Sequence, residues 1–190
     1  LLTVGTDVSV GKMFTALAIE QEMKKRGFDA DVRATGQTGI FIAGSGVSID
    51  AVVADFISGA VEWLCPENSE NHWDIVEGQG SLFNVSYAGV TLGLIHGSQP
   101  DALVVCHEAG RPHMRSMPHF PLIDLPTCID VNLQAARLTN PDVRCVGAAI
   151  NTSRLSEEEG RVFCDKISQE IGLPAVDPLR DGVASLVDQI

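Results

Sequence analysis

A glycine-rich segment near the start of the chain has the residues of a phosphate-binding loop. Residues 5–13 read GTDVSVGKM and directly follow an apolar run at residues 1–4. In such a loop, backbone N–H groups surround phosphate oxygens, and the following helix points its positive dipole end at the anion. The lysine adds a point charge on the phosphates. The predicted cofactor contacts are Gly5, Thr6, Asp7, Val8, Ser9, Val10, Gly11, Lys12 and Met13.

The loop departs from its usual pattern at Met13. A serine or threonine normally follows the lysine, and its hydroxyl holds Mg²⁺. A methionine offers only a thioether, which is a poor ligand for a hard cation. We therefore expect the loop to bind a phosphorylated ligand without a resident metal ion.

An acid follows a later apolar run, in the segment VEGQGSL at residues 76–82. Glu77 is a candidate general base, and Gln79 is a candidate substrate contact. Glu77 could instead hold Mg²⁺ together with Asp7 or Asp50. A further alternative is that Glu77 only caps the loop by accepting hydrogen bonds from glycine N–H groups.

Residues 33–46 read RATGQTGIFIAGSG and combine glycines with neutral hydrogen-bond donors. Glycines let the backbone approach a ligand closely, and hydroxyl and amide groups can then donate to it. The alternative is a flexible connector. The predicted substrate contacts in this segment are Arg33, Thr35, Gln37 and Thr38.

The segment CHEAGRPHMR at residues 106–115 mixes acidic, basic and imidazole side chains. His107 is a candidate general base near neutral pH, and Glu108 could orient it or act in its place. Arg111 and Arg115 are candidates for binding substrate carboxylates through paired hydrogen bonds. The alternative is a solvated polar loop.

Asn151 ends the last long apolar run and carries an amide that both donates and accepts hydrogen bonds. It is a candidate contact for a purine base, although an asparagine at such a place also commonly tethers a turn. Ser156 and the acids at residues 157–159 predict the N-terminus of a helix.

Alternating strands and helices must position these residues. Apolar runs predict strands at residues 1–4, 30–33, 74–77, 102–107, 127–132 and 145–151. Helical spacing predicts helices at residues 12–25, 49–63, 91–96, 132–138 and 156–171. The pattern indicates an α/β fold with a doubly wound, mostly parallel sheet of P-loop NTPase type and helices on both faces. The carboxyl ends of the strands then share one edge, where the candidate residues are expected to meet, and residues 111–126 form a loop or lid beside them.

Composition excludes several classes of function. The 190 residues are 45% hydrophobic, which is enough for one domain with a substantial core. A formal net charge of −12 with only 13 Lys and Arg residues argues against a nucleic-acid partner. No apolar run approaches the roughly 20 residues of a membrane span and no signal peptide is present, so we expect no membrane partner and a cytoplasmic location. Five widely spaced cysteines are expected to be reduced core thiols.

The loop at residues 5–12 resembles that of dethiobiotin synthetase and its relatives, which also carry five residues between the two glycines. In that comparison Glu77 resembles their strand-end acid, Asp50 resembles a second metal ligand, and Asn151 resembles a base-reading asparagine. The match breaks at Met13, where those enzymes use threonine for Mg²⁺. This resemblance implies an alternative function, an ATP- and Mg²⁺-dependent ligase or kinase.

A second resemblance, to the C-terminal domain of the DgcN-like family, covers essentially the whole chain. Five blocks occur in the same order: VGTDVSVGKM, RATGQTGIFIAGSGVSIDAVVADF, WDIVEGQGSLFNVSYAGVTLGLIHGSQPDALVVCHE, NTSRLSEEE and GLPAVDPLRDG. That family is linked to D-glutamate N-acetyltransferase activity, which implies acetyl-CoA as the donor. The chain opens inside its first predicted strand without an initiator methionine. We therefore expect residues 1–190 to be a single P-loop domain of a longer chain, with an N-terminal domain absent.

The expected function is an N-acetyltransferase that moves an acetyl group from acetyl-CoA to the amine of D-glutamate. The loop would hold the CoA pyrophosphate, which needs backbone N–H groups and a lysine but no obligatory Mg²⁺, in agreement with Met13. A non-catalytic nucleotide-binding module is a further alternative. Expected partners are small-molecule substrates, the absent N-terminal domain and, in a homo-oligomer, a second copy of the chain.

Overall fold

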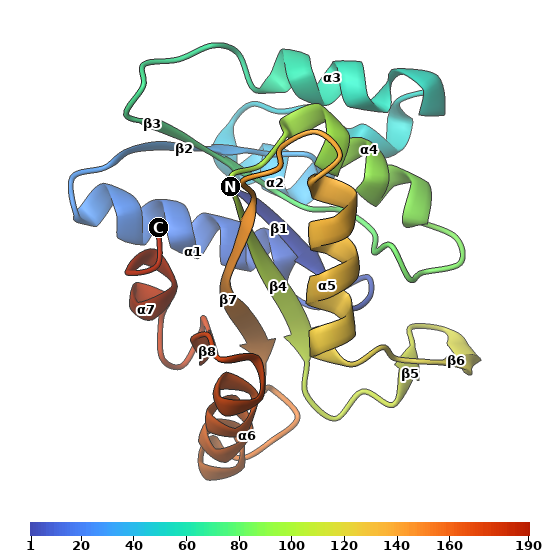
Figure 1. Cartoon of the computed structure of the whole chain (residues 1–190), viewed down its shortest axis with the longest axis vertical. Coiled ribbons are helices and arrows are strands. Elements are labelled where there is room, and N and C mark those ends of the chain that lie inside the picture. Colours follow the sequence, from blue (N-terminus) through green and yellow to red (C-terminus); the bar gives the residue numbers. More distant parts are fainter.

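Six parallel strands form the central sheet of the computed structural model, which describes residues 1–190 (Figure 1). In chain order they are β1 (Leu2–Gly5), β2 (Asp29–Arg33), β3 (His72–Val76), β4 (Ala102–Glu108), β7 (Arg144–Asn151) and β8 (Ala175–Val176). Their spatial order is β2-β3-β1-β4-β7-β8, and every neighbouring pair is parallel. Because β4 lies between β1 and β7, its first five residues are all buried, as its unbroken apolar run predicts.

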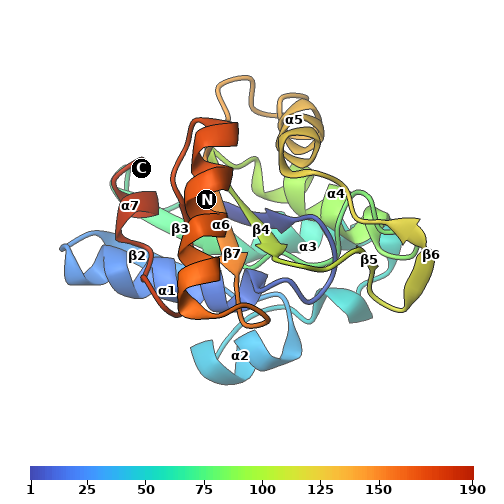
Figure 2. The ribbon, with the colours of Figure 1, turned by 90° about the horizontal axis from the view of Figure 1, so that it is seen from below.

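Helices cover both faces of this sheet (Figures 1 and 2). One apolar cluster joins the sheet to α1 (Lys12–Lys25) and α7 (Ala184–Val187). The other joins it to α3 (Ile57–Leu64), α4 (Ala88–Ser98), α5 (Leu125–Ala136) and α6 (Glu157–Ile171). The predicted doubly wound α/β fold is therefore confirmed. None of the helices combines the length and apolar character that crossing a membrane would require.

The strand predicted at residues 127–132 is wrong, because these residues lie inside α5. The Asp124 carboxylate accepts a hydrogen bond from Thr127 N at 2.8 Å, which caps the start of the helix. The buried residues of the helix are Leu125, Cys128, Ile129, Asn132 and Ala136, a spacing of three and four that fits a helix and not a strand. The helix predicted at residues 132–138 is the second half of this same element.

The single helix predicted at residues 49–63 is instead two short 3₁₀ turns, η1 (Ile49–Ala51) and η2 (Ala54–Phe56), followed by α3. Val52 and Val53 between the turns have extended backbones, with ψ of 133° and 137°. Two consecutive β-branched residues favour that conformation over a helix. Residues of η1 lie at the carboxyl edge of the sheet, where they line a cavity.

Two segments predicted as loops contain regular structure. Within residues 33–46 lies α2 (Gln37–Ala43), which ends at Gly44 with φ of 78°. Within residues 111–126 lies a small antiparallel pair, β5 (His113–Met114) and β6 (Met117–Pro121). Figure 2 shows the β5–β6 pair projecting beyond the carboxyl end of β4. The helix at residues 156–171 is confirmed as α6, where Ser156 and Glu159 form a reciprocal cap.

Candidate functional site

The predicted phosphate loop joins β1 to α1 at the carboxyl edge of the sheet. Thr6 N donates to Cys106 O at 3.1 Å, which holds the start of the loop on β4. Ser9 and Gly11 have positive φ, 54° and 111°. Left-handed residues between helical ones direct neighbouring N–H groups to one side, the geometry of an anion site.

Gly78, at the end of β3, fixes the base of this loop. Its N–H donates to Thr3 Oγ1 at 2.9 Å, and Thr3 Oγ1 donates in turn to Lys12 O at 3.3 Å. A Cβ atom on Gly78 would lie 1.6 Å from Thr3 O. Only glycine therefore fits between the loop and the neighbouring strand.

Lys12 is buried within the loop. Its Nζ donates to Asp7 O at 2.8 Å, and burial lowers the pKa of Lys12 from its usual range. One of the three N–H donors of the ammonium group is therefore bound to the loop, and the other two have no acceptor within the protein.

Two cavities share the loop as a wall. The larger, about 900 Å³, is lined on the loop side by Val8, Ser9 and Met13. The smaller, about 380 Å³, is lined on the loop side by Val10, Gly11 and Phe14. A ligand whose phosphates occupy the loop can thus extend into both cavities.

Polar residues from three segments meet at the larger cavity. Those predicted from the sequence are Thr35, Gln37, Thr38, Glu77, Gln79 and Arg115. The apolar wall of this cavity could not be recognised from the sequence; it is formed by Ile49, Val52, Ile57, Tyr87, Val90 and Met117. These residues lie in or next to η1, α3, α4 and β6, so only the folded chain brings them together.

Glu77 borders the larger cavity and also organises it. One carboxylate oxygen accepts from Thr35 N (2.9 Å) and Gly36 N (3.0 Å), while the other accepts from Gln79 Nε2 (3.0 Å). The carboxylate lies so close to α2 that a Cβ on Gly39 would be 2.2 Å from Glu77 Oε2. The contacts of Glu77 are thus those expected if it caps the loop. No positively charged side chain pairs with its carboxylate.

The Asp7 carboxylate is buried and is hydrogen-bonded within the protein. Its carboxylate accepts from Asn84 Nδ2 (2.8 Å), Arg115 N (2.6 Å) and Arg111 Nη1 (3.0 Å). Burial alone would raise the pKa of Asp7, but these hydrogen bonds and the charge of Arg111 outweigh burial and lower the pKa. Asp7 therefore connects the loop to the residues after β4. Elsewhere too, no group of three or more His, Cys, Asp or Glu side chains is arranged to hold a metal ion.

Arg111 and Glu108 line neither of these two cavities. Arg111 donates to the carboxylates of Asp7 and Glu108, and Glu108 also pairs with Arg154 Nε at 2.5 Å. Both side chains are buried, and their charges are paired within the protein. These contacts do not support the predicted roles in substrate binding and catalysis, which stay untested predictions.

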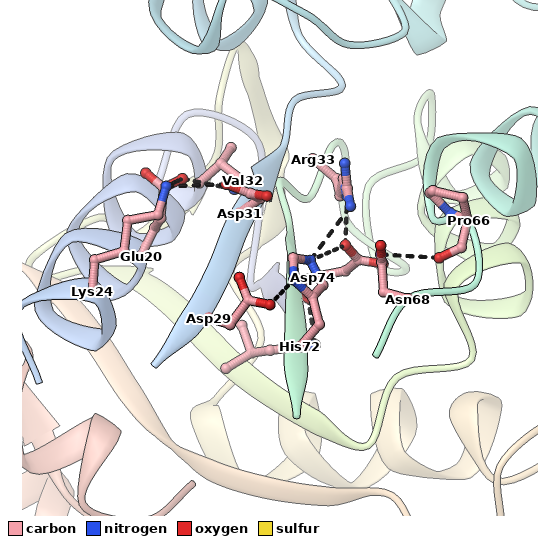
Figure 3. Close-up of polar contacts among 11 residues, drawn as sticks. Glu20, Lys24, Asp29, Asp31, Val32, Arg33, Pro66, Asn68, His72 and Asp74 are labelled. Atoms are coloured by element: carbon pink, nitrogen blue, oxygen red, sulfur yellow. Dashed lines mark hydrogen bonds and ion pairs between the residues drawn. The ribbon is translucent and has the colours of Figure 1, made fainter. Parts of the chain in front are cut away.

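Arg33 lies outside both cavities, on the β2–β3 edge of the sheet (Figure 3). Its Nε donates to Asp74 Oδ1 at 2.5 Å, and His72 lies between Asp74 (3.2 Å) and Asp29 (3.1 Å). The Arg33 side chain thus lies among the polar side chains of β2 and β3. This ion pair away from the cavities does not support its predicted role as a substrate contact, which stays an untested prediction.

His107 also lies outside both cavities. Its Nδ1 is 3.1 Å from Thr6 Oγ1, and its ring stacks on Phe163 with centroids 6.1 Å apart. Burial, reinforced by the charge of Arg111, lowers the pKa of His107 to about 4. This position does not support the predicted role as general base, which stays an untested prediction.

Asn151 lines the smaller cavity, as expected for a contact to a base. Its Oδ1 accepts from Ser153 N at 3.0 Å, so it also tethers the turn after β7. The other wall of this cavity was not predicted; it is formed by Asp177, Pro178, Leu179 and Arg180. The signal available was the block PAVDPLRDG, which contains the short strand β8 and the residues after it.

Comparisons with known proteins agree with this geometry. A family described as "Domain of unknown function (DUF1611_C) P-loop domain" matches residues 1–187. A D-glutamate N-acetyltransferase from Pseudoalteromonas sp is 59% identical over 187 residues, covering 98% of this chain and 56% of the relative. A D-glutamate N-acetyltransferase from Tritonibacter scottomollicae is 53% identical over 189 residues, covering 100% of this chain and 57% of the relative. The chain thus spans about half the length of the curated relatives it matches.

Solved structures give the same fold. A crystal structure of a DUF1611 family protein from Anabaena variabilis matches with a TM-score of 0.94 and 40% identity, over 99% of this chain and 55% of that one. Cobyrinic acid a,c-diamide synthase from Mycobacterium smegmatis, with bound ADP and magnesium, matches with a TM-score of 0.55 and 13% identity, over 98% of this chain and 91% of that one. The second likeness is one of fold alone.

Proposed function

The chain belongs to the DUF1611 family of P-loop domains, and we propose that it binds acetyl-CoA for the N-acetylation of an amino acid, D-glutamate. The curated relatives named D-glutamate N-acetyltransferase support this activity and acceptor. Since those relatives are nearly twice as long as this chain, the proposal concerns the share of the reaction that these residues carry.

The observation that carries the proposal is the position of the phosphate loop between two cavities. The loop holds the CoA pyrophosphate through main-chain N–H groups and Lys12. The adenosine end of CoA lies in the smaller cavity beside Asn151, and the pantetheine arm and thioester lie in the larger one. Met13 lines the larger cavity where a metal-binding hydroxyl would otherwise stand, so the pyrophosphate is held without Mg²⁺.

The larger cavity supplies groups for the acceptor. Arg115 lines it and forms no ion pair within the chain, so its guanidinium can bind a carboxylate of glutamate. Glu77 accepts the proton that the ammonium group of the acceptor must lose. The amine then attacks the thioester carbonyl and the C–S bond breaks. The proton that the new amide nitrogen loses passes to the departing CoA thiolate.

Binding measurements on this chain test the proposal directly. Isothermal titration with acetyl-CoA in EDTA should give saturable binding, and Lys12→Ala should abolish it. With D-glutamate present, release of CoA thiol should also proceed in EDTA. Binding or turnover that instead needs ATP and Mg²⁺ would replace this proposal by a ligase or kinase, and binding without any turnover in the full-length protein would indicate a nucleotide-binding module.

A further inference from the structure

Arg111 has an unusual environment for a residue beside a ligand site. Its side chain is only 8% exposed, and its guanidinium faces four acceptors. Nη1 donates to Asp7 Oδ2 (3.0 Å) and Val8 O (2.8 Å), while Nη2 donates to Ser9 O (3.0 Å) and to the Glu108 carboxylate. Two of the four are main-chain carbonyls of the phosphate loop itself.

These contacts complete a pattern along the loop. The carbonyl of Asp7 accepts from Lys12, and the next two carbonyls, of Val8 and Ser9, accept from Arg111. Three consecutive carbonyls are therefore held by side-chain cations on the inner side of the loop. A loop whose carbonyls are fixed inward leaves its N–H groups free for an anion.

The same network reaches the larger cavity. Asp7 accepts from Arg111 through Oδ2, and that oxygen also accepts from Arg115 N at 2.6 Å. The side chain of Arg115 borders the cavity. One buried carboxylate thus links the phosphate loop to the start of the β5–β6 turn.

We propose that Arg111 is a positioning residue, which holds the phosphate loop in its anion-binding shape and touches no substrate. This inference rests on the proposed function for the identity of the anion, a CoA pyrophosphate. The loop is shaped before the ligand arrives, because Arg111 rather than a bound metal fixes its carbonyls. Losing these charge-assisted bonds should cost affinity for any diphosphate.

Inorganic pyrophosphate and acetyl-CoA are the two probes of the test, titrated into the wild type and four variants. We expect Arg111→Met to weaken binding of both probes by about 10- to 100-fold, the range for charge-assisted hydrogen bonds. The affinities of Arg111→Lys should lie between those of the wild type and of Arg111→Met, because an ammonium group cannot reach all four acceptors. Arg33→Met is the matched control, since it removes a paired arginine far from the loop, and should change neither affinity more than twofold. Arg115→Met should leave pyrophosphate binding unchanged.

Hydrogen exchange adds a readout that distinguishes positioning from contact. Amides of residues 8–10 should exchange faster in Arg111→Met than in the wild type, while amides of β4 should not. Unchanged pyrophosphate affinity in Arg111→Met, no pyrophosphate binding by the wild type, or failure of both Arg111 variants to fold would each overturn the inference. A loss confined to D-glutamate affinity would also overturn it, because Arg111 would then contact the acceptor. Wild-type binding of pyrophosphate but not of acetyl-CoA would refute the proposed function alone.

Discussion

Two glutamates lie at the same edge of the sheet, one on each side of β1, and have opposite surroundings. Glu77 follows β3 and Glu108 ends β4, and both are almost fully buried. Glu77 accepts hydrogen bonds only from neutral N–H groups and borders the larger cavity. Glu108 pairs with two arginines and borders neither cavity described here.

If Glu77 is the general base, as proposed, this difference means that burial alone does not identify such a residue. A carboxylate paired with two guanidinium groups serves to hold them, and removing one partner leaves an uncompensated buried charge. A carboxylate held by neutral amides keeps its negative charge unpaired, so it can take a proton from a bound amine.

Glu77→Gln should lower kcat by about 10²- to 10⁴-fold, the usual contribution of a general base. The amide oxygen of glutamine can still accept from Thr35 N and Gly36 N, so the fold should be retained. Steady-state release of CoA thiol measures kcat, and thermal unfolding serves as the control. A variant that keeps wild-type kcat would show that another group accepts the proton.

Glu108→Gln should act mainly on stability, lowering the free energy of unfolding by about 3 kcal/mol because it leaves buried Arg111 with one carboxylate partner instead of two. Urea denaturation measures this change. If kcat instead fell as far as in Glu77→Gln with stability unchanged, the contrast between the two glutamates would be lost.

Arg115→Ala should raise the KM for the acceptor by about 10-fold, with a much smaller effect on the KM for acetyl-CoA. The reason is that Arg115 borders the cavity without an ion pair, so its charge is available to a substrate carboxylate. Arg33→Ala is the control, because Arg33 is paired with Asp74 outside the cleft. Equal effects of the two substitutions on the acceptor KM would contradict this assignment.

The last effect concerns His107, the residue before Glu108 in β4. Its pKa is about 4 in the folded protein and near 6.5 in the unfolded chain, so the unfolded chain binds more protons between these values. Stability should therefore rise with pH through this window and be lost as pH falls from about 6.5 to 4. Compared with pH 8, His107 should cost about 1–2 kcal/mol at pH 5, and His107→Gln should remove that loss.

Denaturation of both proteins at pH 5 and pH 8 measures the difference. An identical pH dependence for the wild type and His107→Gln would mean that another group causes the loss in acid. If kcat instead fell in acid with the same pH dependence as stability, His107 would take part in the reaction.

The sequence predicts the parts of this molecule that depend on local patterns. The phosphate loop, the parallel sheet and the shared carboxyl edge follow from GTDVSVGKM and from buried apolar runs. Glu77 and Arg115 reach the cavity because each follows the end of a strand or begins a turn at that edge. Such features need only a few neighbouring residues to be recognised.

The partners of charged side chains could not be predicted in the same way. Arg111 contacts Asp7, which lies 104 residues earlier, and Arg33 contacts Asp74, 41 residues later. Nothing in the local sequence distinguishes an arginine that is paired in this way from Arg115, which is free. The strand predicted at residues 127–132 failed for a related reason, because a short apolar run fits either period until the Asp124 cap is seen.

An anion that enters the phosphate loop would bind beside the Asp7 carbonyl, because that carbonyl takes only one of the three N–H donors of Lys12. The other three lysines, Lys24, Lys25 and Lys166, are exposed. An amine-reactive label should modify those three first. The slower labelling of Lys12 would then measure the fraction of molecules whose loop is occupied.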